Sequence, residues 1–157
     1  MHDILILVIG IGNEYRSDDG VGLAIIRALK EKNLPGTQLT ECAGDGMNLI
    51  ETWKVAKVVI LIDAVSSESE PGTIFRFNAL TGPIPTHLSF HSTHAFGVAE
   101  AIELGRTLHQ LPPYLLLFGI EGKNFAAGTN MSPEVENAIQ EVIEQVTREI
   151  RTFLSVA

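Results

Sequence analysis

The stretch Ile4-Leu5-Ile6-Leu7-Val8-Ile9, followed by Gly10-Ile11-Gly12-Asn13, decides the fold. Six consecutive apolar residues that stop at a glycine are typical of a central parallel strand covered on both faces. Apolar residues then recur at helical spacing from Val21 to Leu29. The chain therefore predicts a buried strand, a glycine-containing turn and an amphipathic helix.

The same alternation of strand and helix continues along the rest of the chain, without an internal repeat or a dividing linker. It predicts an α/β fold, a three-layer sandwich with a mostly parallel, twisted sheet of about five strands and helices on both faces. We expect one domain over residues 1–157, with its site beyond the carboxyl ends of the strands. The further predicted strands cover 39–42, 58–62, 73–77 and 114–120, and the further helices cover 46–53, a segment opened by His94, and 133–153.

Composition limits the classes of function. The 157 residues include 11 Lys and Arg against 19 Asp and Glu, so the net charge is -8, and 45% of residues are hydrophobic. A sizeable core is expected, while the acidic balance argues against a nucleic-acid partner. Cys42 is the single cysteine, which excludes an intramolecular disulfide and favours a cytoplasmic setting. The apolar run 4–9 is too short for a membrane anchor, so no membrane insertion is expected.

Several familiar catalytic and cofactor-binding motifs are incomplete or absent in this sequence. The segment from Gly10 begins like a dinucleotide fingerprint, but Tyr15 stands where its last glycine belongs, and a nucleotide-binding fold is disfavoured. Cys42 could act as a nucleophile with His87 or His91, but a lone cysteine in a strand is more often a small core residue. The chain contains no Gly-x-Ser-x-Gly elbow for a serine hydrolase.

Three polar side chains come from three different strand-to-helix junctions. Asp19 follows the first strand, Asp63 ends the apolar run 58–62, and His94 stands at the expected start of a helix. Each has a simpler interpretation. Asp18 and Asp19 would be first-turn acids in a helix capped by Ser17. Asp63 would be a turn residue, and His94 would be a surface histidine. Together, however, two carboxylates and one imidazole form an open divalent site suited to zinc or nickel.

The spaced motifs also resemble a known family. They are Gly10-Ile11-Gly12-Asn13 with Ser17-Asp18-Asp19-Gly20-Val21-Gly22, then Ile62-Asp63-Ala64, then Thr93-His94-Ala95-Phe96-Gly97. The chain resembles the hydrogenase maturation proteases over nearly its whole length. The resemblance implies an endopeptidase that removes a C-terminal extension from the nickel-loaded precursor of a nickel-iron hydrogenase large subunit.

The resemblance also implies roles for individual residues. Asp19, Asp63 and His94 would contact the metal, with Asp19 and Asp63 catalytic, and the nickel would be carried by the substrate rather than held tightly by this chain. Metal-assisted hydrolysis with one carboxylate as general base is favoured, and a proton-sharing pair of aspartates is the alternative. The loop Cys42–Gly46 lacks the family's Gly-Thr pair, and only Gly46 matches. The alternative function is a non-catalytic, metal-reading chaperone for a hydrogenase subunit.

Overall fold

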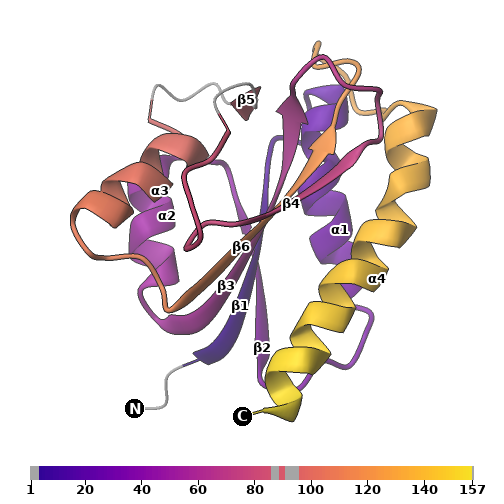
Figure 1. Ribbon diagram of the computed structural model, residues 1–157. Helices are drawn as coiled ribbons and strands as arrows, with labels where there is room; N and C mark the ends of the chain where they lie inside the picture. Colours follow the sequence, from indigo (N-terminus) through magenta and orange to yellow (C-terminus); the bar gives the residue numbers. More distant parts are fainter. Residues whose placement is uncertain (1–3, 86–88, 91–95, 157) are drawn as a thin grey trace.

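The sheet is built around the first strand of the chain. The computed structural model describes residues 4–85, 89–90 and 96–156, and its strands follow the order β2-β1-β3-β6-β4 (Figure 1). The first four run parallel, β4 is antiparallel to β6, and β5 pairs antiparallel with the end of β3. The predicted α/β fold with a mostly parallel sheet is confirmed. The strands are β1 (Ile4–Ile11), β2 (Thr37–Cys42), β3 (Ala56–Ser66), β4 (Ile74–Asn78), β5 (Ser89–Phe90) and β6 (Tyr114–Glu121).

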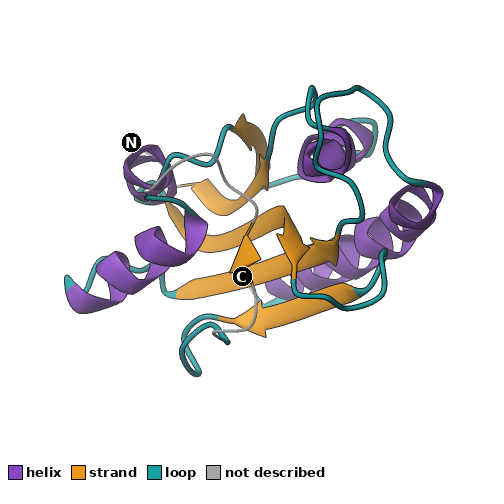
Figure 2. Cartoon of the chain, turned by 90° about the horizontal axis from the view of Figure 1, so that it is seen from above, coloured by secondary structure: helices purple, strands orange, loops and turns teal. Residues whose placement is uncertain are grey.

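Helices cover both faces of this sheet, which gives the three predicted layers (Figure 2). The helices α1 (Val21–Leu29) and α4 (Pro133–Ser155) pack on one face, and α2 (Gly46–Trp53) and α3 (Val98–Thr107) pack on the other. Alternate residues of β1 enter opposite cores, because successive strand side chains point to opposite faces. Thus Ile6 and Val8 pack with α1 and α4, while Leu7 and Ile9 pack with α2 and α3. No helix of the described residues is long and apolar enough to cross a membrane.

The two central strands end at different levels. The pairing between β1 and β3 extends to Gly10 opposite Ile62, but β3 continues to Ser66 through pairing with β5 and β6. Asp63 therefore lies inside β3, and the prediction that the strand ends there is wrong. Pairing with β5 and β6 extends β3 beyond Asp63, and the apolar run alone does not reveal these two partners. Asp63 stands just past the last β1–β3 pair, where the site can form.

Helix α1 makes an unusually close backbone approach to the sheet. A Cβ atom at Gly22 would lie 2.5 Å from the carbonyl oxygens of both Ile11 and Ile62. Only glycine allows this separation, since real Cβ contacts are not that short. Helix α1 therefore packs directly on the backbones of β1 and β3, next to Asp63.

Two predicted helix starts need correction. Helix α3 begins at Val98, after Gly97, and not at His94, which lies outside the described residues. Ser17 does not cap α1, because a short 3-10 helix, η1 (Ser17–Gly20), precedes α1 and Gly20 occupies the N-cap position. The Ser17 hydroxyl instead donates a hydrogen bond to the carbonyl of Ala126, in a distant loop. Long-range partners of this kind leave no mark in local sequence.

Candidate active site

Asp19 is placed by the turn between β1 and α1. Gly12 has a φ of +150°, and a Cβ atom there would lie 1.9 Å from the Asp19 carbonyl oxygen, so the loop folds back tightly onto Asp19. The Asn13 amide donates a hydrogen bond of 3.1 Å to Asp19 Oδ2. Asp19 is only 6% exposed. Its carboxylate is therefore held beneath the surface at the carboxyl end of β1.

Asp63 comes from the neighbouring strand and is buried more deeply, with 1% of its surface exposed. Its Oδ1 accepts a hydrogen bond of 2.8 Å from the amide of Ala64. Burying a carboxylate is costly unless it is paired, so the surroundings of Asp63 call for an explanation.

Both carboxyl groups have raised pKa values, and the charge of Asp19 contributes to the shift of Asp63. Burial raises the pKa of Asp19 to about 6, while the hydrogen bond from Asn13 and the charge of Arg16 lower it. Burial and the negative charge of Asp19 raise the pKa of Asp63 well above its ordinary value. The structure thus brings Asp19 and Asp63 together, as the sequence predicted. Without a cation, the pair retains a proton at pH values where an exposed aspartate would be ionised.

Unpaired polar atoms concentrate at this position. Among the described residues, four buried side-chain nitrogen or oxygen atoms have no hydrogen-bond partner. Three of them are Asp19 Oδ1, Asp63 Oδ2 and Arg16 Nε. Buried polar groups are normally satisfied, and exceptions are concentrated at functional sites. Two acceptors and one donor are therefore free at the same end of the sheet.

Asp18 has a different role from Asp19, which sequence reasoning missed. Its buried carboxylate accepts hydrogen bonds from the amides of Lys123, Asn124 and Ser132 and from the Ser132 hydroxyl, at 2.7 to 2.9 Å. Burial alone would raise the pKa of Asp18, but these bonds outweigh it and lower the pKa. Ser17 adds a backbone bond to Gly128. We call these contacts between residues 17–18 and the loop 122–132 the clasp.

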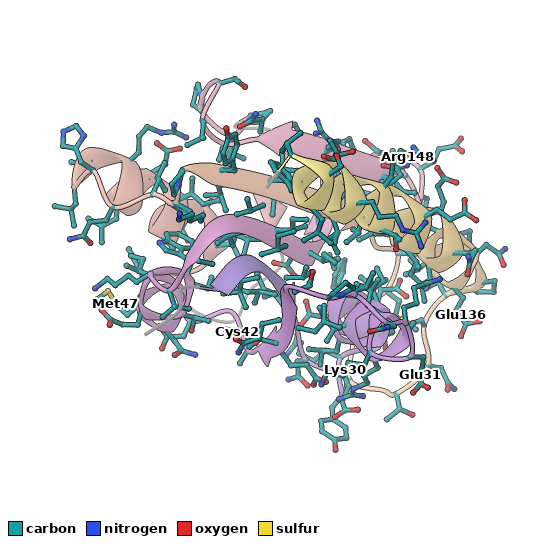
Figure 3. All side chains as sticks on the ribbon, turned by 90° about the horizontal axis from the view of Figure 1, so that it is seen from below. Lys30, Glu31, Cys42, Met47, Glu136 and Arg148 are labelled. Atoms are coloured by element: carbon teal, nitrogen blue, oxygen red, sulfur yellow. The ribbon has the colours of Figure 1, made fainter. Side chains whose placement is uncertain are left out.

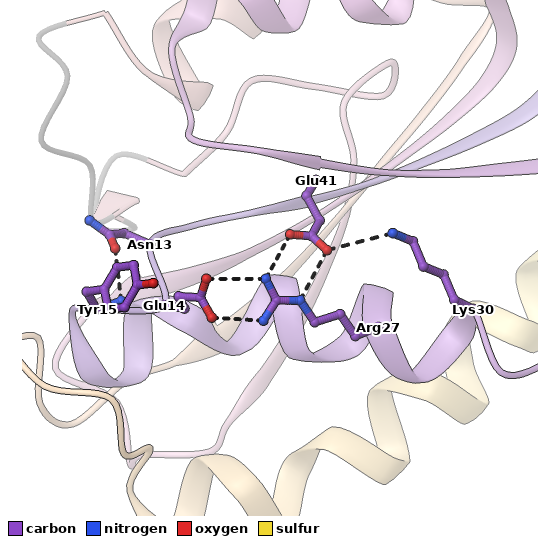
Figure 4. Close-up of polar contacts among 6 residues, drawn as sticks. All are labelled: Asn13, Glu14, Tyr15, Arg27, Lys30 and Glu41. Atoms are coloured by element: carbon purple, nitrogen blue, oxygen red, sulfur yellow. Dashed lines mark hydrogen bonds and ion pairs between the residues drawn. The ribbon is translucent and has the colours of Figure 1, made fainter.

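A surface network fixes the other side of the same turn (Figure 4). Arg27 of α1 contacts Glu14 at 2.9 Å and Glu41 of β2 at 3.0 Å, and Lys30 lies 3.7 Å from Glu41. The hydrogen bonds and charge of Arg27 lower the pKa of both glutamates. The Tyr15 amide donates to the Asn13 side chain. The turn that carries Asp19 is thus connected to α1 and β2 as well as to the clasp.

The remaining candidates are only partly visible. His94, His87 and His91 lie outside the described residues, and no group of three or more metal-ligating side chains occurs within the described part. Cys42 has a buried, free thiol at the end of β2 and packs in the core, as expected. At Gly46, a Cβ atom would lie 2.4 Å from the ring of Phe96, so this glycine is needed for packing.

Comparisons with known proteins agree with this architecture. A family model described as hydrogenase maturation protease matches residues 23–149. The chain is 28% identical over 151 residues to the hydrogenase 2 maturation protease of Escherichia coli, covering 93% of this chain and 90% of that protein. A putative hydrogenase maturation protease of Methanocaldococcus jannaschii is 29% identical over 152 residues, with coverage of 93% and 96%.

A solved structure is similar over the same length. The [NiFe] hydrogenase maturation protease HybD from Thermococcus kodakarensis superposes with a TM-score of 0.74 and 26% identity. The match covers 93% of this chain and 99% of that chain. The likeness therefore includes the whole sheet and both helical layers.

Proposed function

Because the chain belongs to the hydrogenase maturation protease family and is a peptidase, we propose that it removes a C-terminal extension from the nickel-loaded precursor of a nickel-iron hydrogenase large subunit. The name of the Thermococcus relative, a [NiFe] hydrogenase maturation protease, supports this class of substrate. The single free cysteine and the acidic surface charge are in keeping with a reaction in the reducing cytoplasm.

One observation carries the proposal. Asp19 Oδ1 and Asp63 Oδ2 are both buried and both lack a hydrogen-bond partner among the described residues. A divalent cation would supply the missing partner for each oxygen and would relieve the repulsion that raises the pKa of Asp63. His94 is the proposed third ligand. Two carboxylates and one imidazole leave coordination positions open, so the nickel can remain bound to the precursor while it contacts the protease.

The proposed chemistry is hydrolysis of one peptide bond. Contact with nickel places the scissile bond beside Asp19 and Asp63, and one carboxylate accepts a proton from the attacking water. The water oxygen bonds to the carbonyl carbon, the C–N bond breaks, and the carboxyl group returns the proton to the leaving amine. Arg16 is half-buried, and its free Nε can donate a hydrogen bond to a peptide carbonyl of the substrate. A proton-sharing aspartate pair could act on a substrate without nickel.

Replacing Asp19 by Asn tests the proposal. The amide preserves size and can still accept the Asn13 hydrogen bond, but it cannot accept a proton from water or ligate nickel as strongly. We expect cleavage of nickel-loaded precursor to fall by at least about a hundredfold, with the melting temperature maintained or raised. Cleavage is measured by mass spectrometry of the precursor after incubation.

Glu51 offers a matched control, because Glu51→Gln makes the same chemical change at an exposed ion pair with Lys54. This variant should cleave at the normal rate. If Asp19→Asn also cleaves normally, Asp19 has only a structural role. If the unaltered protein binds the precursor and never cuts it, the non-catalytic chaperone is the correct interpretation.

A further inference from the structure

A second site is indicated between the ends of α1 and α4. A groove of about 500 Å³ is lined by Lys32, just after α1, and by residues of α4 that include Thr147, Arg148 and Arg151. Volumes of this size are typical of small-molecule sites. Asp19 precedes α1 and Lys32 follows it, so the nine residues of that helix, about 14 Å, separate the two sites. The groove is therefore distinct from the candidate active site.

Lys and Arg side chains that form no ion pair are concentrated at this groove. The chain has 11 Lys and Arg side chains, all in the described part, and six of them form ion pairs with described carboxylates. Of the five that do not, Lys32, Arg148 and Arg151 all line the groove. One carboxylate, Glu144, lines it as well. The groove is therefore locally cationic in a chain of net charge -8. Figure 3 shows Arg148 on α4, apart from Met47 on α2, which covers the other face of the sheet.

Thr147 provides an independent observation. It is only 6% exposed, lines the groove, and its Oγ1 has no hydrogen-bond partner among the described residues. Threonine in a helix can donate to the carbonyl four residues earlier. Thr52, Thr107 and Thr152 all do so in this structure, and Thr147 does not. Its hydroxyl is therefore buried without a partner, on a residue that lines the groove.

From these observations we propose that the groove binds a phosphate-bearing small molecule. Guanidinium groups match phosphate oxygens in pairs of hydrogen bonds, and the ammonium group of Lys32 adds a third positive charge. The unpaired Thr147 hydroxyl would donate a hydrogen bond to a further phosphate oxygen. Glu144 is an acceptor for a hydroxyl of the organic part of the ligand. Such a site would act independently of peptide cleavage.

The test uses inorganic pyrophosphate as the probe and the full chain as the receptor. Binding is measured by isothermal titration calorimetry, with ionic strength held constant by sodium chloride. We expect saturable binding that weakens by about tenfold or more in Arg148→Gln. Lys57 is another cation without an ion pair, on β3 and outside the groove, so Lys57→Gln removes the same charge as a matched control. Its affinity should remain within about twofold of the unaltered protein.

Thr147→Val gives a second readout that general electrostatics would not produce. Valine has nearly the same shape but no hydroxyl, so the ligand-free protein should melt at a higher temperature while pyrophosphate binds more weakly. The proposal is overturned if binding does not saturate, or if Lys57→Gln weakens it as much as Arg148→Gln. It is also overturned if a glutamate-rich peptide saturates the groove and pyrophosphate does not. Precursor cleavage should be unchanged in Arg148→Gln, which separates this proposal from the proposed function.

Discussion

Asp63 is a carboxyl group whose ionisation opposes folding. Its pKa in the folded protein is raised well above 3.8 by burial and by Asp19, so the folded state keeps a proton that the unfolded state has released. The free energy of unfolding therefore falls as the pH rises above the unfolded pKa. We expect Asp63→Asn, which cannot ionise, to melt a few degrees higher than the unaltered protein at pH 8 and at nearly the same temperature near pH 3.5. Thermal unfolding followed by circular dichroism measures this difference, with exposed Glu51→Gln as the control.

A shift of equal size at both pH values would contradict this view of Asp63, because a packing effect does not depend on protonation.

At the scale of single residues, the sequence predicted that Asp19 and Asp63 would meet, since both follow apolar strand residues at the same edge of the sheet. It could not predict their burial, because Asp63 lies inside β3 and the turn at Gly12 folds back tightly onto Asp19. The separate roles of Asp18 and Asp19 were also hidden, because adjacent acids before a helix look equivalent in sequence.

The clasp connects elements that are more than a hundred residues apart in sequence. Asp18→Ala would leave the amides of Lys123, Asn124 and Ser132 without their acceptor. We expect the free energy of unfolding to fall by about 3 kcal/mol, because buried donors without partners are costly. Asp18→Asn should lose less, since an amide oxygen still accepts. Urea unfolding compares the three proteins, and an Asp18→Ala variant as stable as the unaltered chain would show that the clasp contributes nothing.

Elements were predictable from sequence where local pattern determines them. The apolar runs of β1, β3 and β6 identify buried strands, and Ser132 with Pro133 correctly marks the start of α4. Strand β5 has only two residues and exists through its pairing with β3, so no periodicity could reveal it. The start of α3 was misplaced because His94 looked like a helix-opening residue, whereas the N-cap position is occupied by Gly97.

At the scale of the whole molecule, the proposed reaction requires nickel in the substrate. The proposed ligands, two carboxylates and one imidazole, would leave coordination positions open, so the protease alone should hold nickel weakly. We expect nickel-free precursor to remain uncut, and a protease treated with chelator and then freed of it to cleave loaded precursor at the normal rate. A mass assay on loaded and metal-free precursor gives the answer. Equal cleavage of both would favour the proton-sharing pair of aspartates.

The close packing of Gly22 sets the geometry of this recognition. Helix α1, which starts two residues after Asp19, packs on the carbonyls of Ile11 and Ile62, and Ile62 precedes Asp63. This close backbone packing restrains the separation of the two carboxylates. A rigid spacing of this kind favours ions of one size, because larger ions such as Ca²⁺ or Cd²⁺ need longer bonds to oxygen than Ni²⁺ does. We therefore expect the site to distinguish divalent ions by ionic radius.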